Sequence, residues 1–165
     1  MVNMVKQLNN LTHAKQCPVP CIALNKKYTL AQANGIRFEK KVFNSLSRFF
    51  NHIEHNPWFE YRNNSEFAYC SPDILIKFDN ILLIIEVKLT WVKEAQEKLD
   101  LFYRPIITKA NPDFDPDFVK TLVIVKNLTP ESPEDSSIWS KALDLDKPLL
   151  FWSDEVINNY GIRGM

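Results

Sequence analysis

The stretch from Cys70 to Trp91 reads CSPDILIKFDNILLIIEVKLTW, two apolar runs that meet at Asp79-Asn80. Polar turn residues between two strand-like runs are typical of a β-hairpin. A two-residue turn at Asp79-Asn80 places Asp73 directly opposite Glu86 on one face of the sheet, with Cβ atoms roughly 4.5–5.5 Å apart. Lys88 returns to the same face because side chains alternate along a strand. The hairpin therefore predicts a cluster of two carboxylates and one amine.

Two carboxylates this close repel each other unless a positive charge lies between them, and a divalent metal is the usual solution. Oxygen ligands suit Mg²⁺ or Mn²⁺, and Mg²⁺ is typically held by one or two carboxylates with waters. We expect Asp73 and Glu86 to be ligands, with the Val87 carbonyl as a further ligand at the strand end. Metal-activated water is the nucleophile that phosphodiester hydrolysis needs. Lys88 would orient that water or stabilise the charge of the transition state.

Each predicted strand of the hairpin carries apolar side chains on both faces of the sheet. One face carries Ile74, Ile76, Leu83 and Ile85, and the other carries Leu75, Leu82 and Ile84 together with the charged cluster. Strands of this kind lie in the centre of a sheet that is covered on both sides. The pattern therefore predicts an α/β fold rather than an open sheet.

A helix is predicted before the hairpin. Thr29 and Gln32 match a capping box, and apolar residues then recur at helical spacing to about His52. Gly35 and Glu39 fall on or beside this apolar stripe. A carboxylate that points toward the core is costly unless it is paired or bound to metal, whereas one that only flanks the stripe lies in water.

A second helix is predicted over Val92–Arg104, with Pro105 as its limit. Its expected inner face consists of Val92, Ala95, Leu99 and Phe102. Gln96 and Tyr103 are seven residues apart and therefore project from nearly the same side.

Other segments are predicted from their local pattern. We expect a loose arm over Met1–Lys27, strands over Trp58–Arg62, Phe67–Cys70, Thr121–Lys126 and Pro148–Trp152, a loop over Asn111–Phe118 and a short helix over Ile138–Leu145. Residues 28–165 then form a single domain.

The composition limits the classes of function. The 165 residues suffice for one domain with a buried core. The 20 Lys and Arg balance the 20 Asp and Glu, so any nucleic-acid site must be a local patch. The chain has no run of about 18 apolar residues and no signal-peptide pattern. We expect a cytoplasmic protein without a membrane partner.

Three cysteines, Cys17, Cys21 and Cys70, make an odd count. The spacing of Cys17 and Cys21 is metal-like, and His13 with Cys70 could complete the four ligands of a structural zinc site. Free thiols in a reducing compartment are the favoured interpretation.

The hairpin motif resembles that of a known enzyme superfamily. Pro72-Asp73 followed by Glu86-Val87-Lys88 is similar to the PD-(D/E)XK nuclease motif in its E-x-K form, with one hairpin between the two halves.

The flanking helices extend the resemblance to the RecB-like branch of this superfamily. Gly35-x-x-x-Glu39 is similar to its first motif, in which an acidic residue can join the metal site. Gln96 with Tyr103 resembles its glutamine motif, which contacts DNA or braces the site, although Tyr103 lies further from the glutamine than usual. The resemblance spans residues 35–103.

The resemblance implies a restriction-endonuclease-like αβββαβ core, a central mixed sheet flanked by helices, and an Mg²⁺-dependent deoxyribonuclease. The implied catalytic residues are Asp73, Glu86, Lys88 and Gln96. The implied metal ligands are Glu39, Asp73 and Glu86, to which strand geometry adds the Val87 carbonyl. The resemblance implies nucleic-acid contacts at Gln96 and Tyr103, and the basic residues Lys40 and Lys93 on the two helices are candidate phosphate contacts.

Two functional hypotheses remain at this level. The first is an exonuclease or structure-specific endonuclease acting on DNA, with RNA not separated from DNA by the sequence. The second is a non-catalytic nucleic-acid-binding or assembly module with the same fold, in which Asp73, Glu86 and Lys88 form only a strand-end salt bridge. With zero net charge, a second copy of the chain or a partner protein could complete the binding groove.

Overall fold

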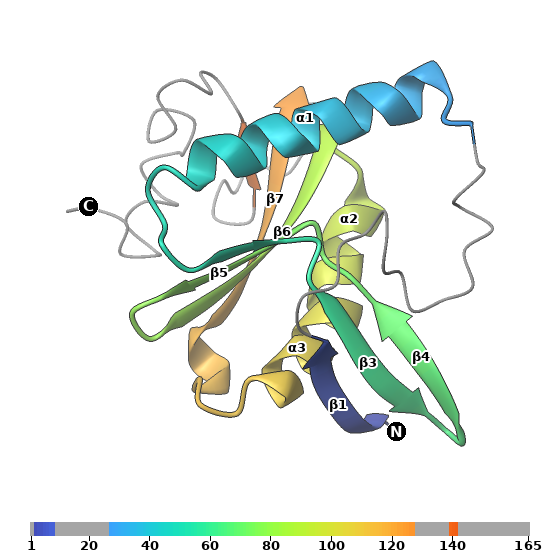
Figure 1. The fold of residues 1–165 in the computed structure, drawn as a ribbon, viewed down its shortest axis with the longest axis vertical. Coiled ribbons are helices and arrows are strands. Elements are labelled where there is room, and N and C mark those ends of the chain that lie inside the picture. Colours follow the sequence, from blue (N-terminus) through green and yellow to red (C-terminus); the bar gives the residue numbers. More distant parts are fainter. Residues whose placement is uncertain (1, 9–26, 128–138, 142–165) are drawn as a thin grey trace.

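The computed structural model describes residues 2–8, 27–127 and 139–141 of the chain (Figure 1). In chain order its elements are β1 (Val2–Leu8), α1 (Leu30–Leu46), β2 (Ile53–His55), β3 (Trp58–Asn63), β4 (Glu66–Cys70), β5 (Ile74–Phe78), β6 (Ile81–Thr90), α2 (Lys93–Glu97), the π-helical η2 (Lys98–Tyr103), α3 (Arg104–Ala110), the 3₁₀-helical η3 (Pro116–Phe118), β7 (Val119–Asn127) and β8 (Trp139–Lys141). The strands form a central sheet in the order β2-β5-β6-β7-β8 and a smaller sheet in the order β1-β3-β4.

The central sheet is mixed. Strand β5 pairs antiparallel with β2 and β6, whereas β7 pairs parallel with β6 and β8 pairs parallel with β7. The predicted hairpin register is confirmed, because Phe78 pairs with Ile81 and Ile74 pairs with Ile85. Asp79 at the turn has a φ of 48°, a left-handed conformation that aspartate tolerates. The expected α/β fold with a central mixed sheet flanked by helices is therefore confirmed.

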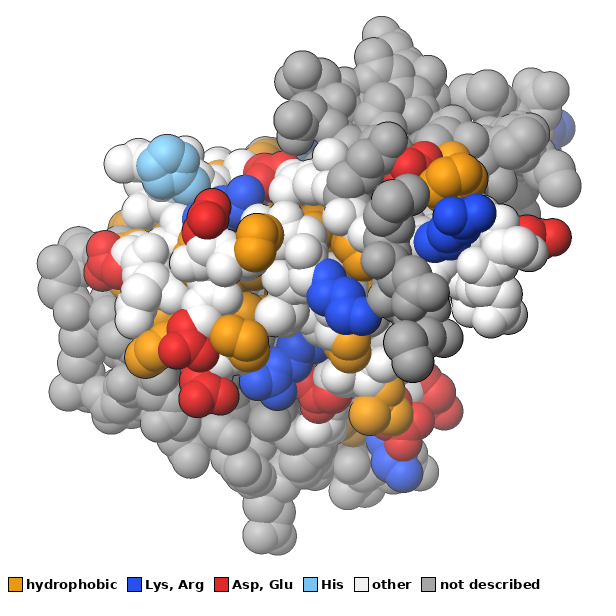
Figure 2. All heavy atoms as spheres, turned by 90° about the horizontal axis from the view of Figure 1, so that it is seen from below, with side chains coloured by type: hydrophobic (Ala, Val, Ile, Leu, Met, Phe, Trp, Pro, Cys, Tyr) orange, Lys and Arg blue, Asp and Glu red, His pale blue; other side chains and the backbone are white. Residues whose placement is uncertain are grey.

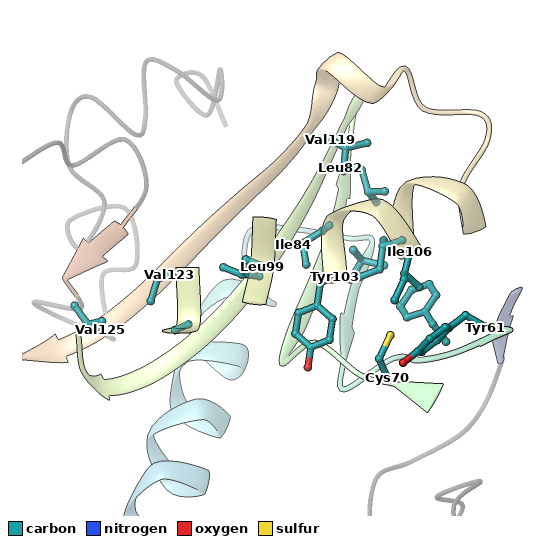
Figure 3. Close-up of a cluster of buried hydrophobic side chains, with 14 of the residues drawn as sticks. Tyr61, Cys70, Leu82, Ile84, Leu99, Tyr103, Ile106, Val119, Val123 and Val125 are labelled. Carbon is teal, nitrogen blue, oxygen red and sulfur yellow. The ribbon is translucent and has the colours of Figure 1, made fainter. Parts of the chain in front are cut away.

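Helices cover both faces of the central sheet, as the two-sided apolar pattern predicts. In Figure 1, α1 crosses one face, and the helices from α2 to α3 lie on the other, next to β1 and β3. The face under α1 buries Ile74, Ile76, Leu83 and Ile85 against Phe38, Val42 and Leu46. The opposite face buries Leu75, Leu82 and Ile84 with Leu99, Tyr103 and Ile106, and Figure 3 shows this second cluster.

The first helix begins as predicted and ends early. The Thr29–Gln32 capping box is present, but α1 stops at Leu46 instead of continuing to His52. The His52 carbonyl accepts a hydrogen bond from the Lys77 N–H at 2.9 Å. This stretch of chain therefore already pairs with β5, and a helical conformation would remove that bond.

The second helical region differs from the prediction in length and phase. It runs through Pro105 to Ala110, and six of its residues form the π-helix η2. Val92, which immediately precedes α2, is exposed. A π-helix holds more residues per turn than an α-helix, so the buried face rotates away from Phe102, which is exposed too. Tyr103 is buried instead. Pro105 is tolerated because the hydrogen-bond pattern already changes at the start of α3, where a missing N–H costs little.

The N-terminal residues 2–8 form a strand, so the expectation of a loose arm is wrong there. Strand β1 pairs antiparallel with β3, with Val5 opposite Tyr61 and Leu8 opposite Trp58. This pairing covers an edge of β3 that would otherwise expose unpaired backbone groups.

Two further expectations concern the C-terminal part and the cysteines. Residues 139–141 form β8 beside β7, so the helix expected over Ile138–Leu145 is wrong at these positions. The strand expected over Pro148–Trp152 and the cysteines at 17 and 21 lie outside the described residues. Cys70 is a buried free thiol. Among the described residues, no helix has the length and apolar character needed to cross a membrane.

Candidate functional site

Asp73 lies immediately before β5 and contacts the main chain of β6. Its Oδ2 accepts a hydrogen bond from the Val87 N–H at 2.6 Å. Continuing the hairpin register beyond the Ile74–Ile85 pair places Asp73 opposite Glu86 and Pro72 opposite Val87. Proline has no N–H to donate, so the ladder offers no donor at this point to the Val87 carbonyl. Pro72 thus ends the pairing and leaves that carbonyl oxygen for a ligand.

Glu86 is the most buried charged residue of the site, with 1% of its surface exposed. Its Oε1 accepts hydrogen bonds from Lys88 Nζ at 2.7 Å and from Lys98 Nζ at 3.3 Å. Its Oε2 is buried and has no hydrogen-bond partner among the described residues. A buried carboxylate oxygen without a partner is costly. This oxygen is therefore available to a cation or to a donor from a ligand.

Glu39 joins the site from α1 through two residues that the sequence analysis did not single out. Its Oε1 lies 2.7 Å from His55 Nε2 and accepts a hydrogen bond from Asn56 Nδ2 at 3.0 Å. The Asn56 N–H donates in turn to the Asp73 carbonyl at 2.9 Å. Glu39 is therefore paired and points into the protein. The Asn56-Pro57 dipeptide is a turn signal that could have drawn attention to this corner.

The charges of the cluster influence one another strongly. Burial, followed by the carboxylates of Glu86 and Glu39, raises the pKa of Asp73 to about 7, although the Val87 N–H acts against this. Burial alone would lower the pKa of Lys88, but the neighbouring carboxylates outweigh it and raise the pKa of Lys88. The cluster therefore combines a carboxyl group that is reluctant to ionise with an ammonium group that holds its proton.

The second helical region reaches the site through Lys98 and Tyr103. The buried Tyr103 hydroxyl donates a hydrogen bond to the Ser71 carbonyl at 2.9 Å, and Figure 3 shows its ring beside Cys70. Lys98 Nζ lies 4.6 Å from the centre of this ring and also contacts Glu86. Tyr103 thus braces the segment before Asp73, which was one of the two roles implied for it.

The other predicted site residues form no hydrogen bond or ion pair with the described residues of the cluster. Gln96 is half-buried on α2, and its side chain makes no hydrogen bond to the described part of the chain. Lys40 is exposed on α1. Lys93 is exposed and forms an ion pair with Glu97 at 3.2 Å. The structure therefore places Lys98, rather than Gln96, against the buried carboxylate.

A surface groove of about 530 Å³ opens beside the cluster, between α1 and the end of β6. Asp73, Glu39, Val87 and Lys88 are among the residues that line it. The face of the molecule turned away from α1 mixes basic and acidic side chains without a large patch of either (Figure 2).

The donor set fits a hard divalent cation. Among residues 2–8, 27–127 and 139–141, no three His, Cys, Asp or Glu side chains converge as a metal-binding group. Mg²⁺ does not require such a group, because one or two carboxylates with waters hold it in many sites. Asp73, the unpartnered Oε2 of Glu86 and the Val87 carbonyl supply oxygen atoms of the required kind.

Comparisons with known proteins do not identify a family for the chain. No protein-family model and no curated protein matches the chain. Among solved structures, the chain is similar to the crystal structure of protein VC1899 from Vibrio cholerae, with a TM-score of 0.42 and 15% sequence identity. The match covers 59% of this chain and 26% of that protein, so the chain spans about a quarter of its length. A likeness of this extent indicates nothing about activity.

Proposed function

We propose that the protein is a metal-dependent nuclease that hydrolyses phosphodiester bonds in DNA, as an exonuclease or a structure-specific endonuclease. The observation that carries this proposal is the buried, unpartnered Oε2 of Glu86, at the hairpin position opposite Asp73. The order of elements supports it as well, because a helix precedes the hairpin and a helical region with a parallel strand follows it. Among the strands of the central sheet alone, with β3 and β4 set aside in the smaller sheet, the order α1-β2-β5-β6-α2-β7 agrees with the αβββαβ order that the resemblance implies.

Three oxygen donors of the hairpin would hold the cation. Asp73, Glu86 Oε2 and the Val87 carbonyl would bind Mg²⁺ or Mn²⁺, which prefer oxygen ligands. The bound ion would act as a Lewis acid and lower the pKa of a water beside the phosphate. Pro72 keeps the Val87 carbonyl out of the ladder, and the Val87 N–H fixes the orientation of the Asp73 carboxylate.

Lys88 contributes a fixed positive charge. Its Nζ lies 2.7 Å from Glu86 Oε1, and a lysine amine is ordinarily protonated at neutral pH. Lys88 lines the groove beside Asp73 and can donate hydrogen bonds to a phosphate oxygen as negative charge develops there. A protonated amine can serve either role expected for Lys88, because it can also orient the attacking water by donating a hydrogen bond to it.

Lys98 and Glu39 position the groups that react. Lys98 and Lys88 both hold Oε1 of Glu86, which leaves Oε2 free to bind a cation. Glu39 orders His55 and Asn56, and the Asn56 N–H holds the main chain of Asp73. Loss of either residue should reduce activity by less than loss of Lys88.

The test is a cleavage assay on linear and circular DNA, single- and double-stranded, and on RNA, with Mg²⁺, Mn²⁺ or a chelator. The parent protein is compared with Lys88→Ala and with Lys77→Ala as a matched control. Both lysines form an ion pair with a glutamate, and their side chains are similarly exposed, at 35% and 34%. Lys77 lies on β5 and does not line the groove.

We expect metal-dependent cleavage by the parent and by Lys77→Ala, and a loss of about 100-fold or more in Lys88→Ala. Resistance of circular substrates would identify an exonuclease. An absence of cleavage with every substrate and metal, or equal cleavage by the two variants, would contradict the proposal. DNA binding without cleavage would instead support the non-catalytic module.

A further inference from the structure

The groove extends from the charged cluster along the N-terminal half of α1, and its outer part is apolar. Tyr28, Ile36 and Val92 all line it, and they are 54%, 44% and 40% exposed. Large apolar side chains gathered at a groove indicate a binding surface more often than isolated ones do. None of the residues from Leu30 to Arg37 is buried, so this half of α1 does not pack on the core.

Gly35 lies in the middle of this unpacked half and also lines the groove. Glycine in a helix interior is unfavourable, and it usually has a packing reason or a functional one. A Cβ atom at this position would meet no other atom within 4 Å. The packing of α1 on its neighbours therefore does not require a glycine. What the glycine does provide is space in the groove.

Three charged side chains line the groove, and all belong to the cluster: the Lys88 ammonium group and the Asp73 and Glu39 carboxylates. Lys88 lies at the inner end beside Asp73, and Lys40 is one helical turn from Ile36 on α1, where residues four apart are neighbours. A duplex exposes its phosphates and hides the faces of its bases, so exposed apolar walls would meet charge. A single strand offers unstacked bases to aromatic and apolar side chains, with cations along its backbone.

We propose that this groove binds the bases of a single-stranded stretch of nucleic acid, whose backbone reaches the cluster at Lys88, and that Gly35 sets the width of the groove. The inference rests on the proposed nuclease function for its choice of ligand. The inference adds that the nuclease prefers single-stranded nucleic acid and that Gly35 determines this preference. Gly35 acts here by leaving room for a base against α1.

The experiment measures binding rather than cleavage. Fluorescence anisotropy with a labelled oligothymidylate and with a blunt-ended DNA duplex is recorded in chelator for the parent, Gly35→Leu and Asn34→Leu. Asn34 is the neighbouring exposed residue and does not line the groove, so Asn34→Leu places the same side chain about 100° around the helix and outside the groove. Thermal melting of both variants shows whether α1 remains folded.

We expect Gly35→Leu to bind oligothymidylate about tenfold more weakly than the parent, which corresponds to the loss of one base contact. Asn34→Leu should bind it as the parent does, and all three proteins should bind the duplex equally and more weakly. Equal oligothymidylate affinity in Gly35→Leu and the parent would overturn the inference. So would tighter binding of the duplex than of the single strand by the parent, or no binding of oligothymidylate.

Failure of this inference can be distinguished from failure of the proposed function. Binding in chelator does not depend on catalysis, so an inactive protein that binds oligothymidylate through the groove supports the inference and contradicts the nuclease. The parent protein could instead show metal-dependent cleavage while Gly35→Leu binds and cleaves single strands as the parent does. That result would support the proposed nuclease function and contradict the inference about the groove. Gly35→Ala, with a smaller side chain, should give an intermediate affinity.

Discussion

The two faces of the central sheet are covered in different ways. On one face, the helical region from α2 to α3 packs along its whole length and buries Ala95, Leu99, Tyr103, Ile106 and Ile107. On the other face, α1 packs only through its C-terminal half, with Phe38, Val42 and Leu46 buried. Residues from its N-terminal half line the groove instead. One face thus supplies stability, and the other keeps an opening at the end of the hairpin beside Asp73, Glu39 and Lys88. Glu86 itself lies on the side of Lys98.

The largest effect is expected at the open face, where a substitution should separate activity from stability. Asp73→Asn retains an oxygen for the Val87 N–H but removes a charge that burial and two nearby carboxylates disfavour. Nuclease activity should fall about 100-fold or more, because the charge of a metal ligand is lost. The melting temperature in chelator should stay equal to that of the parent or rise.

Differential scanning fluorimetry with and without Mg²⁺ completes this test. Mg²⁺ should raise the melting temperature of the parent and not that of Asp73→Asn, since a ligand stabilises only the state that binds it. Asp79→Asn makes the same substitution at the far end of the hairpin, where asparagine tolerates the left-handed conformation. It should keep both activity and the response to Mg²⁺. A parent protein that Mg²⁺ does not stabilise would argue against the metal site.

The closed face should respond mainly in stability. Leu99→Ala removes a fully buried side chain of the second cluster and should lower the free energy of unfolding by about 2–5 kcal/mol. Leu101→Ala is a matched control on the same helix, because Leu101 is 79% exposed and should change stability by less than about 0.5 kcal/mol. Urea denaturation measures both. Similar losses in the two variants would show that η2 does not have the phase described.

A smaller effect is expected where the closed face supports the site. Tyr103→Phe keeps the ring against Cys70 but removes the hydroxyl that donates to the Ser71 carbonyl. Loss of this hydrogen bond should cost about 1 kcal/mol of unfolding free energy. Activity should fall several-fold as well, because Ser71 leads directly into Pro72-Asp73. Unchanged stability together with unchanged activity would remove Tyr103 from the support of the site.

The part of the site that the sequence predicts is the part built from local rules. Strand alternation and the Asp79-Asn80 turn are sufficient to set the register that brings Asp73 opposite Glu86. The same rules place apolar residues on both faces of β5 and β6 and so predict helices on both sides. These inferences need only the period of a strand and the chemistry of a turn.

The rest depends on tertiary structure. Nothing in residues 98–103 marks a π-helix, yet its phase buries Tyr103. Lys98, at the start of η2, contacts Glu86 where Gln96 was expected. Residues 2–8 carry no turn signal that would fix them to β3, because the partner strand lies far along the chain. His55 reaches Glu39 only after α1 and β2 have packed.

Apart from the control variants, the smallest effect on stability is expected at Gly35, and it has the opposite sign. Gly35→Ala should raise the free energy of unfolding by about 0.5–1 kcal/mol, because alanine favours the helix and its methyl group meets no atom within 4 Å. Urea denaturation measures the gain, and oligothymidylate affinity in chelator should fall in the same variant. The Gly35→Ala variant would then be more stable than the parent and bind oligothymidylate more weakly. A gain in stability without any loss of oligothymidylate affinity would mean that binding in the groove does not depend on the space at Gly35.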